Sequence, residues 1–188
     1  IFQLALYALF PWLSPYGPEE GVLETWDYYV SQKGRRIVAV GGVDAHGIIG
    51  DYEEDFVTVS TYVLTPDPFN GAFEHDSASV YAAIREGRCF VGADKVANAS
   101  SFRCHVESGG QPVQMGGTAR LARGANLTVS APEPGLIRVI HDGVPVAEEW
   151  GSSLAIELDR RGAYRVEVKR KACRRYVPWI FGNHIYVV

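Results

Sequence analysis

An aspartate and a histidine stand two positions apart in the segment VAVGGVDAHG, residues 38–47. In an extended chain the side chains of residues i and i+2 point the same way, so we expect Asp44 and His46 to reach toward one point. A carboxylate oxygen and an imidazole nitrogen together suit a divalent Zn, Mn or Fe ion. The preceding Gly41 and Gly42 let the chain turn tightly with little steric obstruction. The pattern predicts two metal ligands at the end of a strand, and a capping aspartate followed by a surface histidine is the other interpretation.

The sequence offers few further ligands for such a site. A catalytic zinc normally has three protein ligands and a water molecule. Among the remaining histidines we single out His75, which stands beside Asp76. We interpret His75 as a loop or helix-start residue, and we interpret three further histidines as residues of alternating strands: His105, His141 and His184.

Several other kinds of chemistry lack their motifs. The sequence has no Gly-rich phosphate loop, no GxSxG and no Cys/His nucleophile pair, so covalent nucleophilic catalysis is not expected. Its three cysteines are far apart and indicate neither a disulfide framework nor a thiolate zinc site. The acidic segment GDYEEDF (50–56) lacks the EF-hand spacing for calcium. We interpret the basic cluster KRKACRR (169–175) as a solvated hairpin loop, so nucleic acid is not an expected partner.

The charge and hydropathy of the chain are those of a globular protein. Hydrophobic residues make up 47% of its 188 residues and charged residues 21%. The apolar opening IFQLALYALFPWL is shorter than the roughly 20 residues that span a bilayer, so no membrane association is expected. Most acidic residues lie in the first half of the chain and most basic residues in the second, which suggests two bodies with different surfaces.

The first half of the chain alternates helical and extended patterns. Proline and two glutamates at 18–20 favour a helix start, apolar residues then recur at helical spacing, and Gly34 supplies a stop, which predicts a helix over 18–33. The apolar run IVAV (37–40) is typical of a strand covered on both faces, as in a parallel sheet. A second strand is predicted within 55–64, a helix from Asp76 or Ser77 to Gly87, and a short strand within 88–94.

The second half reads as strands alone. From residue 100 onward short alternating segments are separated by turn signals such as Asp142-Gly143 and Arg161-Gly162, at spacings typical of a β-sandwich. We therefore expect a domain boundary within residues 95–101.

Three longer stretches resemble a known family. They are ETWDYYVSQKGRRIVAVGGVDAHG (24–47), YAAIREGRCFVG (81–92), and YRVEV with VPWIFGNHIYV (164–168 and 177–187). In order and spacing they resemble the carboxyl-terminal portion of the polymerase and histidinol phosphatase (PHP) superfamily of metallohydrolases, in the branch of carbaryl-hydrolase-like enzymes. The similarity runs from residue 18 to the end of the chain.

The resemblance implies an α+β fold and a set of site residues. Residues 1–98 would form the carboxyl-terminal segment of a distorted β/α barrel, and residues 99–188 an all-β immunoglobulin-like sandwich. Asp44 and His46 match the family's last ligand motif, so they are the candidate metal-binding and catalytic residues. Arg88 belongs to the matching Gly-Arg-x-Phe-Val pattern and is a candidate for binding substrate.

The family's other metal ligands, which begin with a His-x-His motif, are absent from this sequence. We therefore expect a fragment of a metal-dependent hydrolase of the phosphoesterase type, in which several divalent metal ions (Zn, Mn or Fe) activate water against a small-molecule ester or phosphoester. Its expected partner is a missing N-terminal part of the same polypeptide, and the fragment alone should be inactive. The competing hypothesis is a non-catalytic β-sandwich module that binds carbohydrate or protein through Trp150 or Trp179.

Overall fold

A computed structural model describes residues 17–19, 21–43, 45, 52–172 and 175–188 of the chain. The helices are α2 (Val22–Ser31), α3 (Tyr52–Asp55) and α4 (Phe73–Glu86). The strands are β1 (Ser60–Val63), β2 (Cys89–Gly92), β3 (Arg103–Glu107), β4 (Val113–Gln114), β5 (Thr118–Ala119), β6 (Asn126–His141), β7 (Val144–Glu157), β8 (Gly162–Ala172), β9 (Arg175–Gly182) and β10 (Ile185–Val187).

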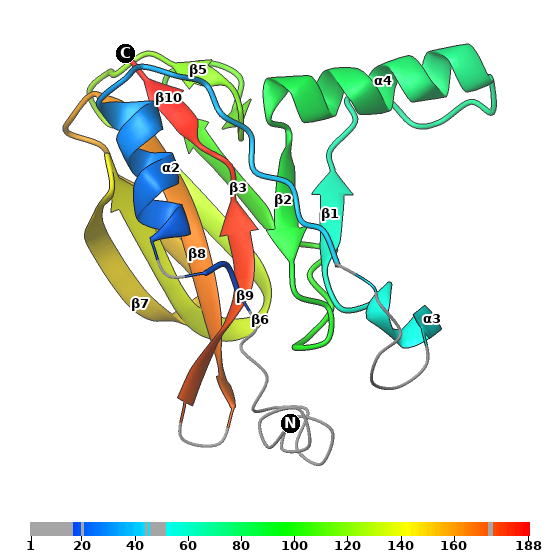
Figure 1. The fold of residues 1–188 in the computed structure, drawn as a ribbon. Helices are drawn as coiled ribbons and strands as arrows, with labels where there is room; N and C mark the ends of the chain where they lie inside the picture. Colours follow the sequence, from blue (N-terminus) through cyan, green and yellow to red (C-terminus); the bar gives the residue numbers. More distant parts are fainter. Residues whose placement is uncertain (1–16, 20, 44, 46–51, 173–174) are drawn as a thin grey trace.

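These strands form one sheet that curls around the core (Figure 1). Its order is β1-β2-β9-β8-β6-β3-β4, with β7 also paired to β6 and with β10 paired to β8 and β5. Every pairing is antiparallel except that of β10 with β5. The long strand β6 bends at a register break between Ser130 and Gly135, and it pairs with β3 before the break and with β8 after it.

This architecture contradicts the predicted fold class. The sheet is mostly antiparallel and continuous, so the described residues form neither a β/α barrel segment nor an immunoglobulin-like sandwich. The apolar run at 37–40 was the basis for a buried parallel strand, but in the structure it belongs to no β-ladder. The run is not covered on both faces either, since Ile37 and Val40 are exposed. The neighbouring strands β1 and β2, on either side of α4 in the chain, pair antiparallel.

Strands from both sides of the predicted domain boundary share this sheet. Phe90 of β2 is registered with Gly182 of β9, and β9 continues into β8 and the rest of the sheet. The division of the chain into domains at residue 98 stays a prediction.

The two longer helices confirm the helical patterns of the sequence, with different bounds. Helix α2 is shorter than predicted and buries Trp26 and Val30, which pack with Ala163. Helix α4 begins at Phe73, earlier than predicted, while the carboxylate of Asp76 accepts hydrogen bonds from two backbone N–H groups of the preceding turn. It ends at Gly87, whose φ of 79° is in the left-handed region that favours glycine.

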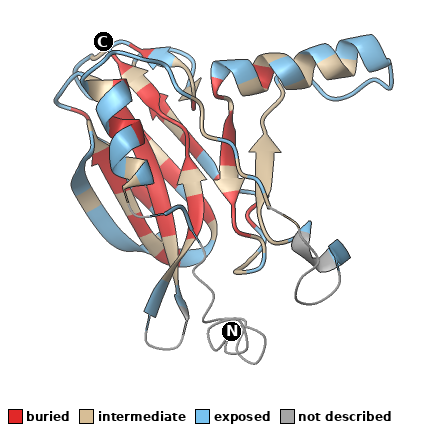
Figure 2. Ribbon diagram, viewed as in Figure 1, coloured by how far each residue is buried: buried red, intermediate tan, exposed pale blue. Residues whose placement is uncertain are grey.

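The hydrophobic core lies inside the curl of the sheet, where Figure 2 shows the buried residues concentrated on the strands. Phe90 packs between Tyr62, at 4.8 Å between ring centroids, and Phe102, at 5.0 Å. Trp179 is fully buried, and its indole N–H donates a hydrogen bond of 2.7 Å to the carbonyl of Ala97. These contacts join β1 and β2 to the later strands.

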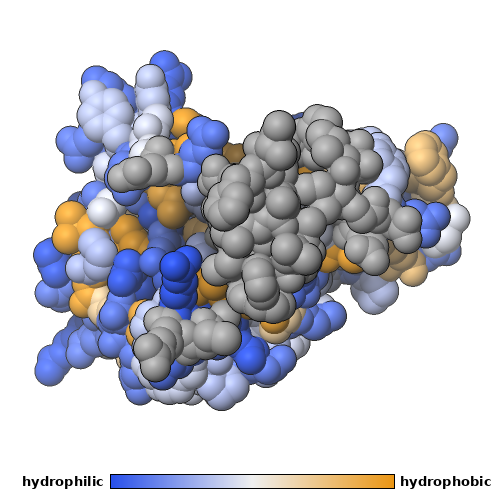
Figure 3. All heavy atoms as spheres, turned by 60° about the horizontal axis from the view of Figure 1, so that its bottom comes forward, coloured by the Kyte–Doolittle hydropathy of each residue, from blue (hydrophilic) through white to orange (hydrophobic). Residues whose placement is uncertain are grey.

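No helix within the described residues is long and apolar enough to cross a membrane. On the face turned forward in Figure 3, hydrophobic surface occurs as separate patches between hydrophilic side chains.

Candidate functional site

The predicted metal ligands Asp44 and His46 lie outside the described residues, as do Gly50 and Asp51 of the weak calcium candidate. The structure does describe the segment that leads to the pair, residues 37–43. Within the described part of the chain, no group of three or more His, Cys, Asp or Glu side chains is arranged to hold a metal ion. Residues 37–43 are therefore the described part of the chain that directly precedes the predicted metal ligands.

Two polar side chains fix one edge of this segment. Asn183 accepts a hydrogen bond of 2.8 Å from the backbone N–H of Ala39 and donates one of 3.0 Å to the carbonyl of the same residue. Its amide also donates to the carbonyl of Cys89 at 2.9 Å. The hydroxyl of Thr61 bonds both the N–H and the carbonyl of Gly41, at 2.8 and 3.2 Å. The side chains of Asn183 and Thr61 thus form the hydrogen bonds that the backbone of a neighbouring strand would normally form with the segment.

The other edge of the segment is open. The backbone N–H and C=O groups of Val38 and Val40 have no hydrogen-bond partner among the described residues. The side chain of Val40 is also exposed, with 59% of the residue's surface accessible. Extended backbone with one free edge is suited to pairing with a further strand.

The close fit of the segment against the sheet explains one of its two glycines. A Cβ atom on Gly41 would lie 2.7 Å from Cγ1 of Val91 and 2.8 Å from Cγ1 of Val59, closer than van der Waals contact allows. A Cβ atom on Gly42 would meet nothing within 4 Å. Gly41 is therefore needed for close packing against β2, which differs from the tight turn that the sequence indicated.

An apolar groove of about 620 Å³ runs beside the same segment. Val22, Trp26 and Tyr29 of α2 line one side of it, while Val91 and Phe181 contribute from the sheet. The groove and the free edge of the segment adjoin, so an apolar strand placed there would bury side chains and pair its backbone at once.

Arg88, the predicted substrate-binding residue, lies beside the beginning of this segment. Neighbouring Gly87 is in contact with Val38, since a Cβ atom at Gly87 would be 3.4 Å from Cγ2 of that valine. Gly41 lies farther along β2, against Val91. The role of Arg88 toward the Asp44 and His46 pair stays a prediction.

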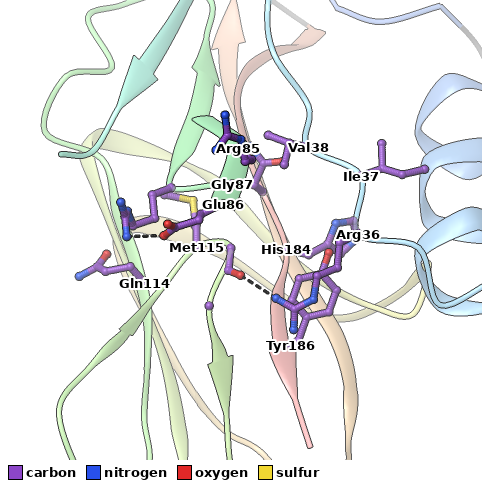
Figure 4. Close-up of a pocket in the computed structure, with 14 residues that line it drawn as sticks. Arg36, Ile37, Val38, Arg85, Glu86, Gly87, Gln114, Met115, His184 and Tyr186 are labelled. Atoms are coloured by element: carbon purple, nitrogen blue, oxygen red, sulfur yellow. Dashed lines mark hydrogen bonds and ion pairs between the residues drawn. The ribbon is translucent and has the colours of Figure 1, made fainter. Parts of the chain in front are cut away.

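Arg88 instead lines a second cavity, of about 520 Å³. Figure 4 shows Glu86, Gly87 and Met115 on one side of this cavity and Arg36, His184 and Tyr186 on the other. The carboxylate of Glu86 pairs with the guanidinium of Arg88.

A buried group of charged side chains lies under α2, and sequence reasoning missed it. The guanidinium of Arg165 donates two hydrogen bonds to the carboxylate of Asp27, at 2.6 and 2.7 Å, and a third to Glu167 at 2.6 Å. His184 Nε2 lies 3.2 Å from Oδ1 of Asp27, and all four residues are buried. Asp27 is four residues after Leu23 and three before Val30, so an acid on the apolar face of the helix was the available signal.

The protonation of this group follows from its burial and its partners. Burial raises the pKa of Asp27, but the hydrogen bonds from Arg165 and His184 outweigh burial and hold that pKa below its ordinary value. For His184 burial is the stronger effect, so its pKa lies below its ordinary value despite the hydrogen bond with Asp27. A neutral His184 therefore donates its Nε2 proton to the aspartate.

Three of the remaining histidines lie where the sequence indicated, and His184 does not. His75 is in the first turn of α4 and contacts Asp76, with 3.1 Å between Nδ1 and Oδ1. His105 lies in β3, and His141 ends β6, where it stacks on Tyr164 at 4.4 Å between ring centroids. His184, between β9 and β10, is buried rather than on the surface of the sheet.

No family model matches this chain, and neither the curated proteins nor the solved structures include a match to it. The resemblance to PHP metallohydrolases therefore rests on the motif residues alone.

Proposed function

We propose that this chain supplies two ligands, Asp44 and His46, to the metal centre of a hydrolase. The observation that carries the proposal is the Asp-x-His pair at the end of a segment that Asn183 and Thr61 hold against the sheet. A rigid approach favours metal binding because ligand side chains then lose little freedom when the ion binds. The proposal includes membership of the PHP superfamily, which the motifs at 24–47, 81–92 and 177–187 support and the antiparallel sheet does not.

The donor set fits a divalent transition metal. One carboxylate oxygen and one imidazole nitrogen suit Zn, Mn or Fe, although two protein ligands are fewer than the three of an ordinary catalytic zinc site. When bound, such a metal lowers the pKa of a coordinated water from 15.7 to about 7, which provides a nucleophile for an ester or phosphoester. In this reaction Asp44 would hold the ion and orient the attacking water, and His46 would complete the part of the ligand set that this chain provides.

We propose that another part of the polypeptide supplies the further metal ligands. The backbone edge at Val38 and Val40, which is unpaired among the described residues, supports the addition of such a part. Unpaired backbone groups and an exposed valine beside an apolar groove form a surface that gains hydrogen bonds and buried area when another strand adds to it. A polypeptide part that adds there would approach the end of the segment, next to Asp44. We propose that the catalytic site is complete only with that part, and that the 188 residues alone bind metal weakly.

Zinc titration calorimetry tests the two proposed ligands. The wild-type chain is expected to bind Zn²⁺ with a dissociation constant on the order of 10 µM to 1 mM, because two ligands give only part of the affinity of a complete site. His46→Ala and Asp44→Ala should each weaken binding at least about tenfold. The matched control is His75→Ala, which removes another histidine that adjoins an aspartate and should leave zinc binding unchanged.

Two results would contradict the proposal. One is zinc affinity that His46→Ala and Asp44→Ala leave intact. The other is zinc affinity that His75→Ala reduces as much as His46→Ala does, because binding would then be a property of surface histidines in general.

A second candidate function, a non-catalytic binding module, is favoured by one pair of aromatic side chains. Trp150 on β7 and Tyr176 on β9 are about half exposed, and their ring centroids are 6.2 Å apart. Exposed aromatic rings of this kind stack on sugar rings or anchor a protein partner. Trp179, the other anchor expected from the sequence, is fully buried and belongs to the core.

A glycan array separates this second function from the first. The binding module predicts that a carbohydrate is retained by the wild-type chain and lost with Trp150→Ala. The absence of any Trp150-dependent ligand, together with zinc binding that depends on His46, would favour the hydrolase proposal.

A further inference from the structure

The second cavity, between α4 and the β4–β5 turn, is lined by more positively than negatively charged side chains. Its lining includes three arginines, Arg36, Arg85 and Arg88, and a single carboxylate, that of Glu86. The volume of about 520 Å³ is in the range of sites for small molecules. Ile37, Val38, Met115 and Tyr186 supply apolar surface in the same cavity.

Backbone packing gives this cavity a fixed floor. Gly87, at the end of α4, and Gly116, in the turn between β4 and β5, approach so closely that a Cβ atom on Gly87 would lie 3.2 Å from Cα of Gly116. A Cβ atom on Gly116 would collide with the carbonyl of Glu86. The N–H of Gly116 is in turn bonded to the carbonyl of His184 at 2.7 Å. One wall of the cavity is therefore formed by tightly packed backbone, at Gly87 and Gly116, and not by side chains.

Arg36 is held at one side of the cavity, and some of its guanidinium N–H groups are not used by its two hydrogen bonds. Its guanidinium lies over the ring of Tyr186, with 4.2 Å from Cζ to the ring centroid, and donates hydrogen bonds to the carbonyl of Gly116 at 3.3 Å and the hydroxyl of Thr118 at 2.5 Å. A guanidinium has five N–H donors, so those two bonds leave others for a ligand. Stacking on a ring fixes the plane of the guanidinium without consuming donors.

Arg88 and Gln114 leave polar atoms unsatisfied at the other side. Arg88 pairs with Glu86 through Nη1, while its Nε is buried without a hydrogen-bond partner in the described part of the protein. Oε1 of Gln114 is also buried and has no hydrogen-bond partner among the described residues. A buried donor without a partner costs about 1–3 kcal/mol, so an oxyanion that accepts a hydrogen bond from Nε of Arg88 would relieve that cost. Arg88 keeps 27% of its side-chain surface accessible, which gives a ligand a first point of contact.

We propose that this cavity binds a small organic oxyanion, in which a phosphate or carboxylate group meets Arg36 and Arg88 and an apolar body lies against Ile37, Val38 and Met115. The planar N–H fork of arginine matches the oxygens of both groups. Arg85 adds positive charge that attracts the ligand. This binding requires no metal and does not depend on the proposed hydrolase function.

Calorimetry on the full chain in the presence of a chelator tests the proposal with three probes. Phenyl phosphate carries both the oxyanion and the apolar body, inorganic phosphate only the oxyanion, and phenol only the body. Phenyl phosphate should bind at least about tenfold more tightly than inorganic phosphate, because burying a phenyl ring adds more than the roughly 1.4 kcal/mol that tenfold represents. Phenol should not bind detectably. Benzoate in place of phenyl phosphate then reports whether carboxylate is accepted as well as phosphate.

Three arginine variants identify the place of binding. Arg36→Gln and Arg88→Gln should each weaken phenyl phosphate binding at least about tenfold, since each removes charge-assisted hydrogen bonds. Arg35→Gln is the matched control, because Arg35 is the exposed neighbour of Arg36, does not line the cavity, and loses the same charge. It should change the affinity by less than about twofold, because an exposed charge outside the site is screened by salt.

The proposal is overturned if phenyl phosphate does not bind at about 10 mM, where even a weak site would fill. It is also overturned if Arg35→Gln weakens binding as much as Arg36→Gln, since binding would then reflect net charge. Thermal unfolding of each variant is recorded in parallel. Should Arg36→Gln fail to fold because its bonds to Gly116 and Thr118 are lost, Arg88→Gln alone decides the outcome.

Discussion

At the scale of single residues, the buried carboxylate of Asp27 connects α2 to Arg165 of β8 and to His184. It accepts both hydrogen bonds that Arg165 directs at α2, and it lies within 3.2 Å of His184. Only 6% of the Asp27 side-chain surface and 3% of that of Arg165 is accessible. When one member of such a buried pair is removed, the other is left as an uncompensated charge.

Asp27→Asn should therefore lower the free energy of unfolding by about 3–5 kcal/mol. Urea denaturation of the variant and the wild type measures this difference. Asp159→Asn is the control, because Asp159 forms an exposed pair with Arg160 and its loss should cost less than about 1 kcal/mol. Equal, small losses for both variants would mean that the buried pair does not hold α2 to the sheet.

The pKa shifts of Asp27 and His184 predict that stability falls in acid. The folded-state pKa of His184 is depressed, so between that value and the unfolded value of 6.5 the unfolded chain binds more protons, and stability decreases as the pH decreases. The depressed pKa of Asp27 affects stability at lower pH. The stabilisation that ionised Asp27 contributes is fully present above its unfolded-state pKa of 3.8 and is lost as the pH falls through its folded-state pKa. Urea denaturation at a series of pH values should show a decline that begins below about pH 6.5, and His184→Gln should remove that first part of it. A wild-type stability that stays level between pH 7 and pH 5 would refute this prediction.

At the scale of elements, residues 37–43 determine how the candidate metal ligands are presented. Gly41 lies so close to Val59 and Val91 that a methyl group has no space, whereas Gly42 faces open space. Gly41→Ala should destabilise the protein by about 1–3 kcal/mol through overpacking. Gly42→Ala, the matched control, should stay within about 0.5 kcal/mol of the wild type. Thermal or urea unfolding of the two variants measures the effects, and equal values would mean that the segment is not packed against β2.

The sequence predicted helices and strands better than their arrangement. Apolar spacing around Trp26 and Val30 located α2, the glycine at 87 located the end of α4, and alternation located the strands after residue 100. The strand predicted at 37–40 forms no backbone ladder; instead the side chain of Asn183 bonds Ala39, and that of Thr61 bonds the next residue of the segment, Gly41. Nothing local to residues 37–41 encodes partners that stand 20 and 144 positions away.

The same limit applies to the candidate sites. The spacing of Asp44 and His46 could be recognised in the sequence because two ligands on one predicted extended strand form a local pattern. The pairing of Asp27 with Arg165 joins positions 138 residues apart, and the cavity between Arg36 and Arg88 depends on the contact of Gly87 with Gly116. Of these charged residues the sequence singled out only Arg88, because the contacts that bring the others together join distant parts of the chain.

At the scale of the whole molecule, the described residues form a curled antiparallel sheet, an apolar groove beside it, and a segment whose backbone at Val38 and Val40 is unpaired. The proposed metal centre is incomplete without a part that adds to that segment. We therefore expect the 188 residues alone, supplied with Zn²⁺ or Mn²⁺, to hydrolyse phenyl phosphate no faster than the metal ions in buffer do. Release of phosphate that requires the protein and the metal, and that a chelator stops, would contradict this expectation.

The most direct measurement of the central claim is the nuclear magnetic resonance spectrum of the histidine side chains during zinc titration. The chain has five histidines, and the spectrum of His46→Ala identifies the signal of His46. The metal-site proposal predicts that zinc shifts or broadens the imidazole nitrogen signal of His46 first, and that Asp44→Ala abolishes this change. A His46 signal that stays in place while zinc shifts other histidines, or that responds equally in Asp44→Ala, would contradict the proposal that Asp44 and His46 bind one metal ion together.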